Sequence, residues 1–88
     1  MKRQWVYIYS DADEQLFIGT TEDAGMLLSD LQDRAKELLY LCPFKQVFNA
    51  LAQKSLLERL TKPTILSFVA KNKEKTRLWI SQLKDLYL

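Results

Sequence analysis

Two short segments rich in β-branched and aromatic residues lie close together near the start of the chain. Residues 5–9 read Trp-Val-Tyr-Ile-Tyr and residues 16–20 read Leu-Phe-Ile-Gly-Thr. Both compositions favour extended strands, and the short polar segment between them, residues 10–15, is typical of a turn. Two strands joined so closely pair most readily as an antiparallel hairpin. Alternation places Val6 and Ile8 on one face of the first strand and a row of aromatic side chains on the other, namely Trp5, Tyr7 and Tyr9.

The segment after the hairpin predicts a helix followed by a third strand. Leucine and alanine recur at three- and four-residue spacing from Ala24 to about Leu41, which is typical of an amphipathic helix. Thr21 or Asp23 is a suitable N-cap for it. Residues 44–50 fit a third strand, although their alternation is imperfect.

The second half of the chain predicts further helices. Residues 54–62 and 74–88 have helical spacing, and the apolar residues expected to face inward in the last helix are Leu78, Trp79, Leu83 and Leu86. Residues 64–70 fit either a strand or a helix that begins at a proline, and we favour the helix. The predicted fold is therefore α+β. A small three-stranded antiparallel sheet, opened by the N-terminal hairpin, packs with three to four helices.

Size and composition limit the chemistry. Eighty-eight residues, 48% of them hydrophobic, form one domain over residues 1–88, near the lower size for independent folding, so self-association is an expected source of stability. Cys42 is the single cysteine and histidine is absent, which excludes an internal disulfide, the usual zinc sites and histidine-assisted hydrolases. No segment reads as a signal peptide or a membrane span, so we expect a cytoplasmic protein without membrane contact.

Charge divides the chain into two parts. Residues 4–33 contain seven acidic residues and no lysine or arginine, whereas residues 34–88 contain eleven basic and four acidic residues. One basic run is a candidate for binding nucleic-acid phosphates, although such a run is also typical of a solvated connection between helices; it comprises Lys71, Lys73, Lys75 and Arg77.

The hairpin resembles the opening of the GIY-YIG nuclease domain, in particular its small stand-alone members. Tyr7 is the centre of a Val-Tyr-Ile triplet, and ten residues later a second motif begins, formed by Phe17, Ile18 and Gly19. A Thr-Glu-Asp helix start follows at residues 21–23. Residues 43–48 are loosely similar to the family's segment before its third strand. The resemblance covers residues 5–24 well and the last 25 residues hardly at all.

The resemblance implies a phosphodiester-cleaving site from which most of the chemistry is missing. In this family a tyrosine hydroxyl helps to activate water, an arginine on the first helix holds the phosphate, and a later glutamate binds a divalent cation. Tyr7 keeps the first hydroxyl, but Phe17 replaces a second tyrosine and Leu27 stands at the arginine position. Glu58 is the only reasonable heir of the metal-binding glutamate, or else a surface residue that pairs with a lysine four residues away.

These observations favour a non-catalytic GIY-YIG-like interaction module that associates with itself or with a partner protein. Apolar residues that could close such an interface are Trp79, Tyr87 and Leu88. Two alternatives remain: a divergent DNA endonuclease that uses Tyr7, Tyr9 and Glu58 with Mg²⁺, and a nucleic-acid-binding domain that uses residues 71–77. A cofactor is expected only in the first of these. The acidity of residues 4–33 opposes nucleic acid near the hairpin.

Overall fold

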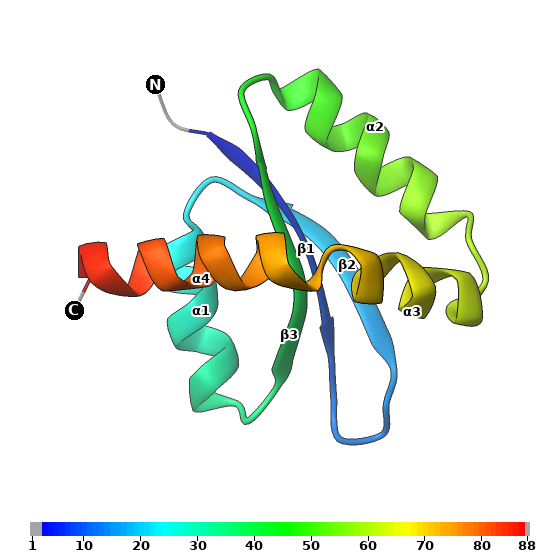
Figure 1. Cartoon of the computed structure of the whole chain (residues 1–88), viewed down its shortest axis with the longest axis horizontal. Coiled ribbons are helices and arrows are strands. Elements are labelled where there is room, and N and C mark those ends of the chain that lie inside the picture. Colours follow the sequence, from blue (N-terminus) through cyan, green and yellow to red (C-terminus); the bar gives the residue numbers. More distant parts are fainter. Residues whose placement is uncertain (1–2, 88) are drawn as a thin grey trace.

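The computed structural model describes the backbone of residues 3–87 and the side chains of residues 3–85. Its strands and helices are β1 (Gln4–Ser10), β2 (Leu16–Thr21), α1 (Ala24–Asp33), β3 (Glu37–Phe44), α2 (Val47–Glu58), α3 (Lys62–Lys71) and α4 (Lys73–Tyr87). The strands form one antiparallel sheet in the order β2-β1-β3 (Figure 1). The predicted α+β fold, a three-stranded antiparallel sheet packed with three to four helices, is confirmed, and the structure has four helices.

β1 and β2 form the predicted hairpin. Its turn is closed by Asp11, whose carboxylate accepts the backbone N–H groups of Asp13 and Gln15 at 3.0 and 2.9 Å. The helix α1 then begins where the sequence predicts. The carboxylate of Asp23, its N-cap, accepts the N–H of Met26 at 3.0 Å, which satisfies one of the otherwise unpaired donors at the helix start.

The third strand lies earlier in the chain than predicted. α1 ends at Asp33, not near Leu41, and the chain reverses through Ala35, which has a left-handed φ of 55°. The leucines that extended the helical pattern belong to β3, because pairing with β1 outweighs their helix propensity. The β1–β3 register shifts by one residue beside Ile8 and Tyr9, which leaves Leu39 as an extra residue at a bulge.

The strand predicted over residues 44–50 is wrong, since α2 begins at Val47. Gln46 is its N-cap and makes no side-chain capping bond, so the sequence carries no strong signal for this helix start. The helix predicted over residues 54–62 is correct only up to Glu58. The helical prediction for residues 64–70 is confirmed by α3, which has Pro63 in its first turn.

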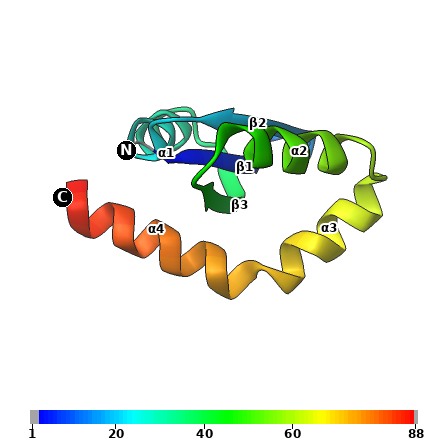
Figure 2. The ribbon, with the colours of Figure 1, turned by 90° about the horizontal axis from the view of Figure 1, so that it is seen from above.

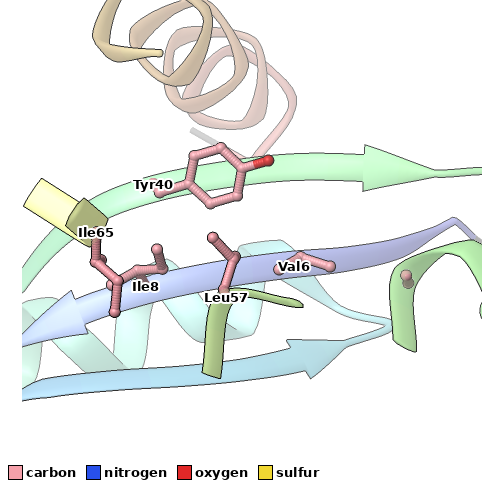
Figure 3. Packing of buried hydrophobic residues seen from close by; sticks show 6 residues of the cluster. Val6, Ile8, Tyr40, Leu57 and Ile65 are labelled. Atoms are coloured by element: carbon pink, nitrogen blue, oxygen red, sulfur yellow. The ribbon is translucent and has the colours of Figure 1, made fainter. Parts of the chain in front are cut away.

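Each face of the sheet carries its own buried cluster. On one face, α2 and α3 pack against β1 and β3, and the cluster consists of Val6, Ile8, Tyr40, Ala50, Leu57 and Ile65 (Figure 3). On the other face, α1 and α4 enclose Trp5, Ala24, Leu41 and Leu83. The rings of Trp5 and Trp79 of α4 pack edge to face, with their centroids 5.6 Å apart. The alternation predicted for β1 is therefore confirmed.

The inward faces of α4 are partly as predicted. Leu83 is buried and Trp79 is half-buried, but Leu78 is 63% exposed, so its predicted inward orientation is wrong. Leu78 lies one residue before Trp79, and consecutive residues on a helix point about 100° apart. The side chains of Leu86 and Tyr87, and the whole of Leu88, lie outside the described residues.

The helices α3 and α4 form an arc along one edge of the sheet (Figure 2). This is the β3 edge, where the backbone N–H of Leu41 donates to the buried hydroxyl of Thr76 at 3.3 Å. On the opposite side β2 is the outermost element, with no helix beyond it in Figure 2. No helix in the described part of the chain has both the length and the apolar character needed to cross a membrane.

Candidate functional site

The pair formed by Tyr7 and Gly19 is the centre of the aromatic face. The two residues lie opposite each other in the β1–β2 ladder, and the tyrosine ring folds across the glycine. A Cβ at position 19 would overlap the Tyr7 hydroxyl and would lie 2.6 Å from its Cζ. Gly19 therefore leaves the space that the tyrosine ring occupies, which gives this motif pair a steric reason that is independent of catalysis.

Three aromatic rings continue from this pair along the sheet. Tyr7 and Tyr9 stack with centroids 6.0 Å apart, and Tyr9 and Phe17 stack at 4.9 Å with an angle of 17° between the rings. Cross-strand and same-face aromatic pairs of this kind stabilise a hairpin. The rings of Phe17 and Tyr9 lie toward the hairpin turn and are part-exposed, with Phe17 36% exposed.

Lys36, for which the sequence predicts no role at this site, completes this group. The ammonium of Lys36 lies 5.5 Å from the Tyr9 centroid and 5.4 Å from the Phe17 centroid, within the range of cation–π attraction. Lys36 belongs to the turn between α1 and β3, so only the correct position of the third strand brings it here. A basic group therefore does reach the edge of the tyrosine site, from a segment that was predicted to be helical.

Burial makes Tyr7 a weaker acid than an ordinary tyrosine. Its pKa is raised first by desolvation of the phenol and second by the neighbouring Tyr9. A phenol with a raised pKa remains protonated at neutral pH and donates a hydrogen bond, whereas a water-activating base needs a lowered pKa. The environment of Tyr7 thus shifts its acidity away from the value that a general base requires.

Leu27, at the position where the resemblance implies an arginine, belongs to the core. It packs against the cluster that α1 and α4 enclose, together with Leu28. The arginine next along this helix, Arg34, is exposed and pairs with Asp30 at 3.3 Å. The helix α1 therefore presents no guanidinium to Tyr7 at the position where the resemblance implies one.

Glu58 lies apart from Tyr7. It is on α2, which packs against the opposite face of the sheet, and it pairs with Lys54 at 3.6 Å, as the four-residue spacing suggests. Within the described residues, no three acidic or cysteine side chains gather in a group that could hold a metal ion. The structure thus brings Tyr7, Tyr9, Phe17, Ile18 and Gly19 together in the hairpin and leaves Glu58 elsewhere.

The basic run is divided between two helices and does not form one surface. Lys71 ends α3, and the other three residues lie in the first turns of α4. Residues two apart on a helix point about 200° apart, so Lys75 points away from Lys73 and Arg77. Those two line a hollow of about 500 Å³ between β3 and the arc, which Glu37 also lines. Arg77 pairs with Glu74 at 3.6 Å.

The outer face of α2 carries large exposed apolar side chains. Phe48 is 78% exposed. Three further apolar side chains on this helix are at least half exposed, namely Val47, Leu51 and Leu56. On this helix Phe48 lies opposite the buried residues Ala50 and Leu57, with Leu51 and Leu56 on either side of it. This face is not predicted from the sequence, because the strand predicted over residues 44–50 includes Val47 and Phe48.

Comparison with known proteins assigns no family. The chain matches no protein-family model, no curated protein and no solved structure. The likeness to the GIY-YIG domain accordingly remains a prediction that depends on the residues of the hairpin and on the start of α1.

Proposed function

We propose that this chain is a GIY-YIG-like interaction module that has no nuclease activity and acts through association with another protein or with a second copy. The observation that carries the proposal is the packing of Leu27. In a nuclease of this kind an arginine at this point would hold the phosphate, and arginine's bidentate grip has no apolar equivalent. Here the position contributes to the core between α1 and α4.

The state of Tyr7 supports the same conclusion. Its pKa is raised by burial, and its ring covers Gly19. Its ring stacks on Tyr9, and the next ring in the row is Phe17, which has no hydroxyl. Packing thus accounts for the geometry of this strand pair, with no contribution from acid–base chemistry.

Exposed apolar surface supports association. Phe48 and its neighbours on α2 present side chains that a monomeric domain usually buries, and large exposed apolar groups are typical anchors of protein interfaces. Cys42 is the single cysteine and lies half-buried, so a reducing compartment suits the chain, and we include a cytoplasmic location in the proposal.

Lys36 favours the alternative of a divergent DNA endonuclease or nucleic-acid-binding domain. It places a positive charge beside Tyr9 and Phe17, where a phosphate group would be attracted. In the catalytic form of this alternative a divalent cation such as Mg²⁺ is required. The negative charge of the acidic residues in the hairpin and α1 opposes nucleic-acid binding at this place.

The experiment is a nicking assay on plasmid and branched DNA with Mg²⁺ or Mn²⁺, using the wild type, Tyr7→Phe and Lys36→Ala. We expect no cleavage above background by any of the three. Cleavage by the wild type that Tyr7→Phe abolishes would refute the proposal. Salt-dependent DNA retention that Lys36→Ala weakens would support the alternative.

Association is tested by sedimentation at several concentrations and by cross-linking, with Phe48→Asp as the variant. Met26→Asp is the matched control, because Met26 is 71% exposed on α1. We expect Phe48→Asp to reduce association and Met26→Asp to leave it unchanged. A protein that stays monomeric and captures no partner in either form contradicts association.

A further inference from the structure

The outer edge of β2 is open, in contrast to the β3 edge. β2 reads Leu-Phe-Ile-Gly-Thr-Thr, with no proline and no charged residue. Its register with β1 is regular. An edge strand without such features is a template for pairing with another extended chain. Figure 2 shows β2 as the outermost element on its side of the molecule.

The backbone groups available on this edge follow from the hairpin geometry. In an antiparallel pair, successive residues direct their N–H and C=O groups alternately toward and away from the partner strand. The backbone N–H of Asp11 donates to the carbonyl of Gln15 at 3.2 Å, so the backbone groups of Gln15, the residue before β2, point toward the β1 side of the hairpin. Counting by two from Gln15, every second residue faces inward, and the residues whose groups point outward are Leu16, Ile18 and Thr20.

These outward groups make no other hydrogen bond within residues 3–85. Neither the backbone bonds outside the helices and strands nor the side-chain bonds involve the N–H or C=O groups of Leu16, Ile18 or Thr20. They are free to bind an added strand, which provides affinity through main-chain hydrogen bonds.

Charge decides which kind of strand fits. The start of β2 follows the turn acids Asp13 and Glu14, and its end precedes Glu22 and Asp23, all four of them exposed. A second copy paired through β2, parallel or antiparallel, would bring acidic residues against acidic residues at both ends. Like charges in this arrangement oppose pairing, whereas a partner strand with basic residues at both ends is attracted.

A hollow beside the start of β2 would receive a side chain of the added strand. It has a volume of about 380 Å³ and is lined by Gln15, Leu16, Phe17, Lys62 and Ile65. Leu16 and Ile65 give it an apolar floor. The ammonium of Lys62 donates to the Glu14 carbonyl at 2.7 Å and offsets only part of the acidic charge there. Strand addition commonly gains its specificity from pockets for alternate side chains.

The geometry points to the β2 edge as a docking site for an extended peptide segment of a partner protein, flanked by lysine or arginine at both ends, which adds as a fourth strand to the sheet. This inference rests on the proposed interaction function and names its partner chemistry. It assigns recognition to the edge of β2, a surface separate from the exposed face of α2.

The probe is a synthetic peptide of alternating threonine and valine with two lysines at each end. Two matched peptides complete the set: one with glutamates in place of the lysines, and one with lysines but with a proline in the centre. Binding is measured by titration at low salt, and amide hydrogen exchange is followed by NMR. We expect the first peptide to bind, and the amides of Ile18 and Thr20 to become protected while Gly19 and Thr21 change little.

Two sets of variants test the charges and the edge. Asp13→Lys with Glu22→Lys should weaken the lysine-flanked peptide on the order of tenfold at low salt. Glu74→Lys with Asp85→Lys makes the same change of net charge on α4 and should leave binding unchanged. Thr20→Pro removes one outward N–H and should abolish binding, once circular dichroism shows that the variant folds.

Several results would overturn the inference. Equal binding of the proline-containing peptide would mean attraction by surface charge without strand addition. Binding of the glutamate-flanked peptide would refute the charge argument, and a wild-type dimer that Thr20→Pro separates would make a second copy the occupant. If none of the three peptides binds while Phe48→Asp still reduces association, only this inference fails and the proposed function stands.

Discussion

The two edges of the sheet are protected in different ways. The β3 edge has a bulge at Leu39 and a proline, Pro43, which has no N–H to offer, and Thr76 of α4 accepts the N–H of Leu41. The β2 edge is regular, uncharged and uncovered. The chain from residue 62 onward thus closes one edge and leaves the other open. The features that close the β3 edge are absent from the β2 edge, so the β2 edge is available to a partner.

The largest expected effect comes from loosening the arc over β3. Leu83 is 6% exposed and packs against Trp5, Ala24 and Leu41. Leu83→Ala should lower the free energy of unfolding by about 3 kcal/mol, because it removes buried methyl groups and leaves a cavity. Urea denaturation measures the loss, and hydrogen exchange should accelerate at Leu41 more than at Gly19. Equal acceleration at both strands would show that the arc does not protect β3 in particular.

A second test targets the side of the sheet that carries β2. Gly19→Ala places a methyl group where the Tyr7 ring lies, so the ring must leave its stack with Tyr9. We expect a loss of about 2 kcal/mol in thermal or urea unfolding, typical of overpacking. The double variant with Tyr7→Ala removes the overlap. The two changes should therefore not add, and a strictly additive double variant would contradict the steric account.

The cap on the β3 edge gives a smaller effect. Thr76 is 4% exposed, and its hydroxyl accepts the Leu41 N–H. Thr76→Val keeps the shape of the side chain but leaves that N–H buried without a partner, which should cost about 1.5 kcal/mol. Thr76→Ser retains the hydroxyl and serves as the control. If both variants lose the same stability, the hydroxyl is not the group that matters.

Alkaline pH should lower the free energy of unfolding through Tyr40 on the β3 side more than through Tyr7, whose ring covers Gly19 of β2. Burial raises the pKa of Tyr40 on β3, with Cys42 as the next cause. In the unfolded chain this phenol ionises near its ordinary pKa of about 10, so the folded state holds its proton longer. Stability is then constant below that value and falls above it, by at most about 1.4 kcal/mol per pH unit. Tyr40→Phe should flatten the fall measured by urea denaturation between pH 10 and 11.

The hairpin was predictable because its signals are local. Alternation, turn residues and the cap at Asp23 all lie within about twenty residues, and each is confirmed. β3 was not predictable in the same way. Its leucines continue the helical spacing of α1, and only pairing with β1, a contact distant in the sequence, makes the segment a strand.

The error in β3 also hid part of the site. Lys36 reaches Tyr9 and Phe17 because β3 begins one residue later and lies beside β1. The exposed face of α2 is not predicted for the related reason that the predicted third strand covers the first turn of this helix. The motif residues Tyr7 and Gly19 were found from sequence because both lie in the hairpin, where spacing alone determines the pairing.

The smallest expected effect concerns the turns that lead into the two edge strands. Glu14 precedes β2 with a φ of 61°, and Ala35 precedes β3 with a φ of 55°. A left-handed backbone conformation destabilises the folded state by about 1 kcal/mol when the residue has a Cβ. Glycine removes this strain, but its greater freedom in the unfolded chain offsets part of the gain. Glu14→Gly and Ala35→Gly should each stabilise the fold by about 0.5 kcal/mol, with Glu14→Gln as the control for lost charge. If Ala35→Gly stabilises while Glu14→Gly does not, the β2 turn is free to relax in solution, which fits an edge that rearranges when a strand is added. Equal gains would instead indicate that both edges are held equally rigid in the unbound protein.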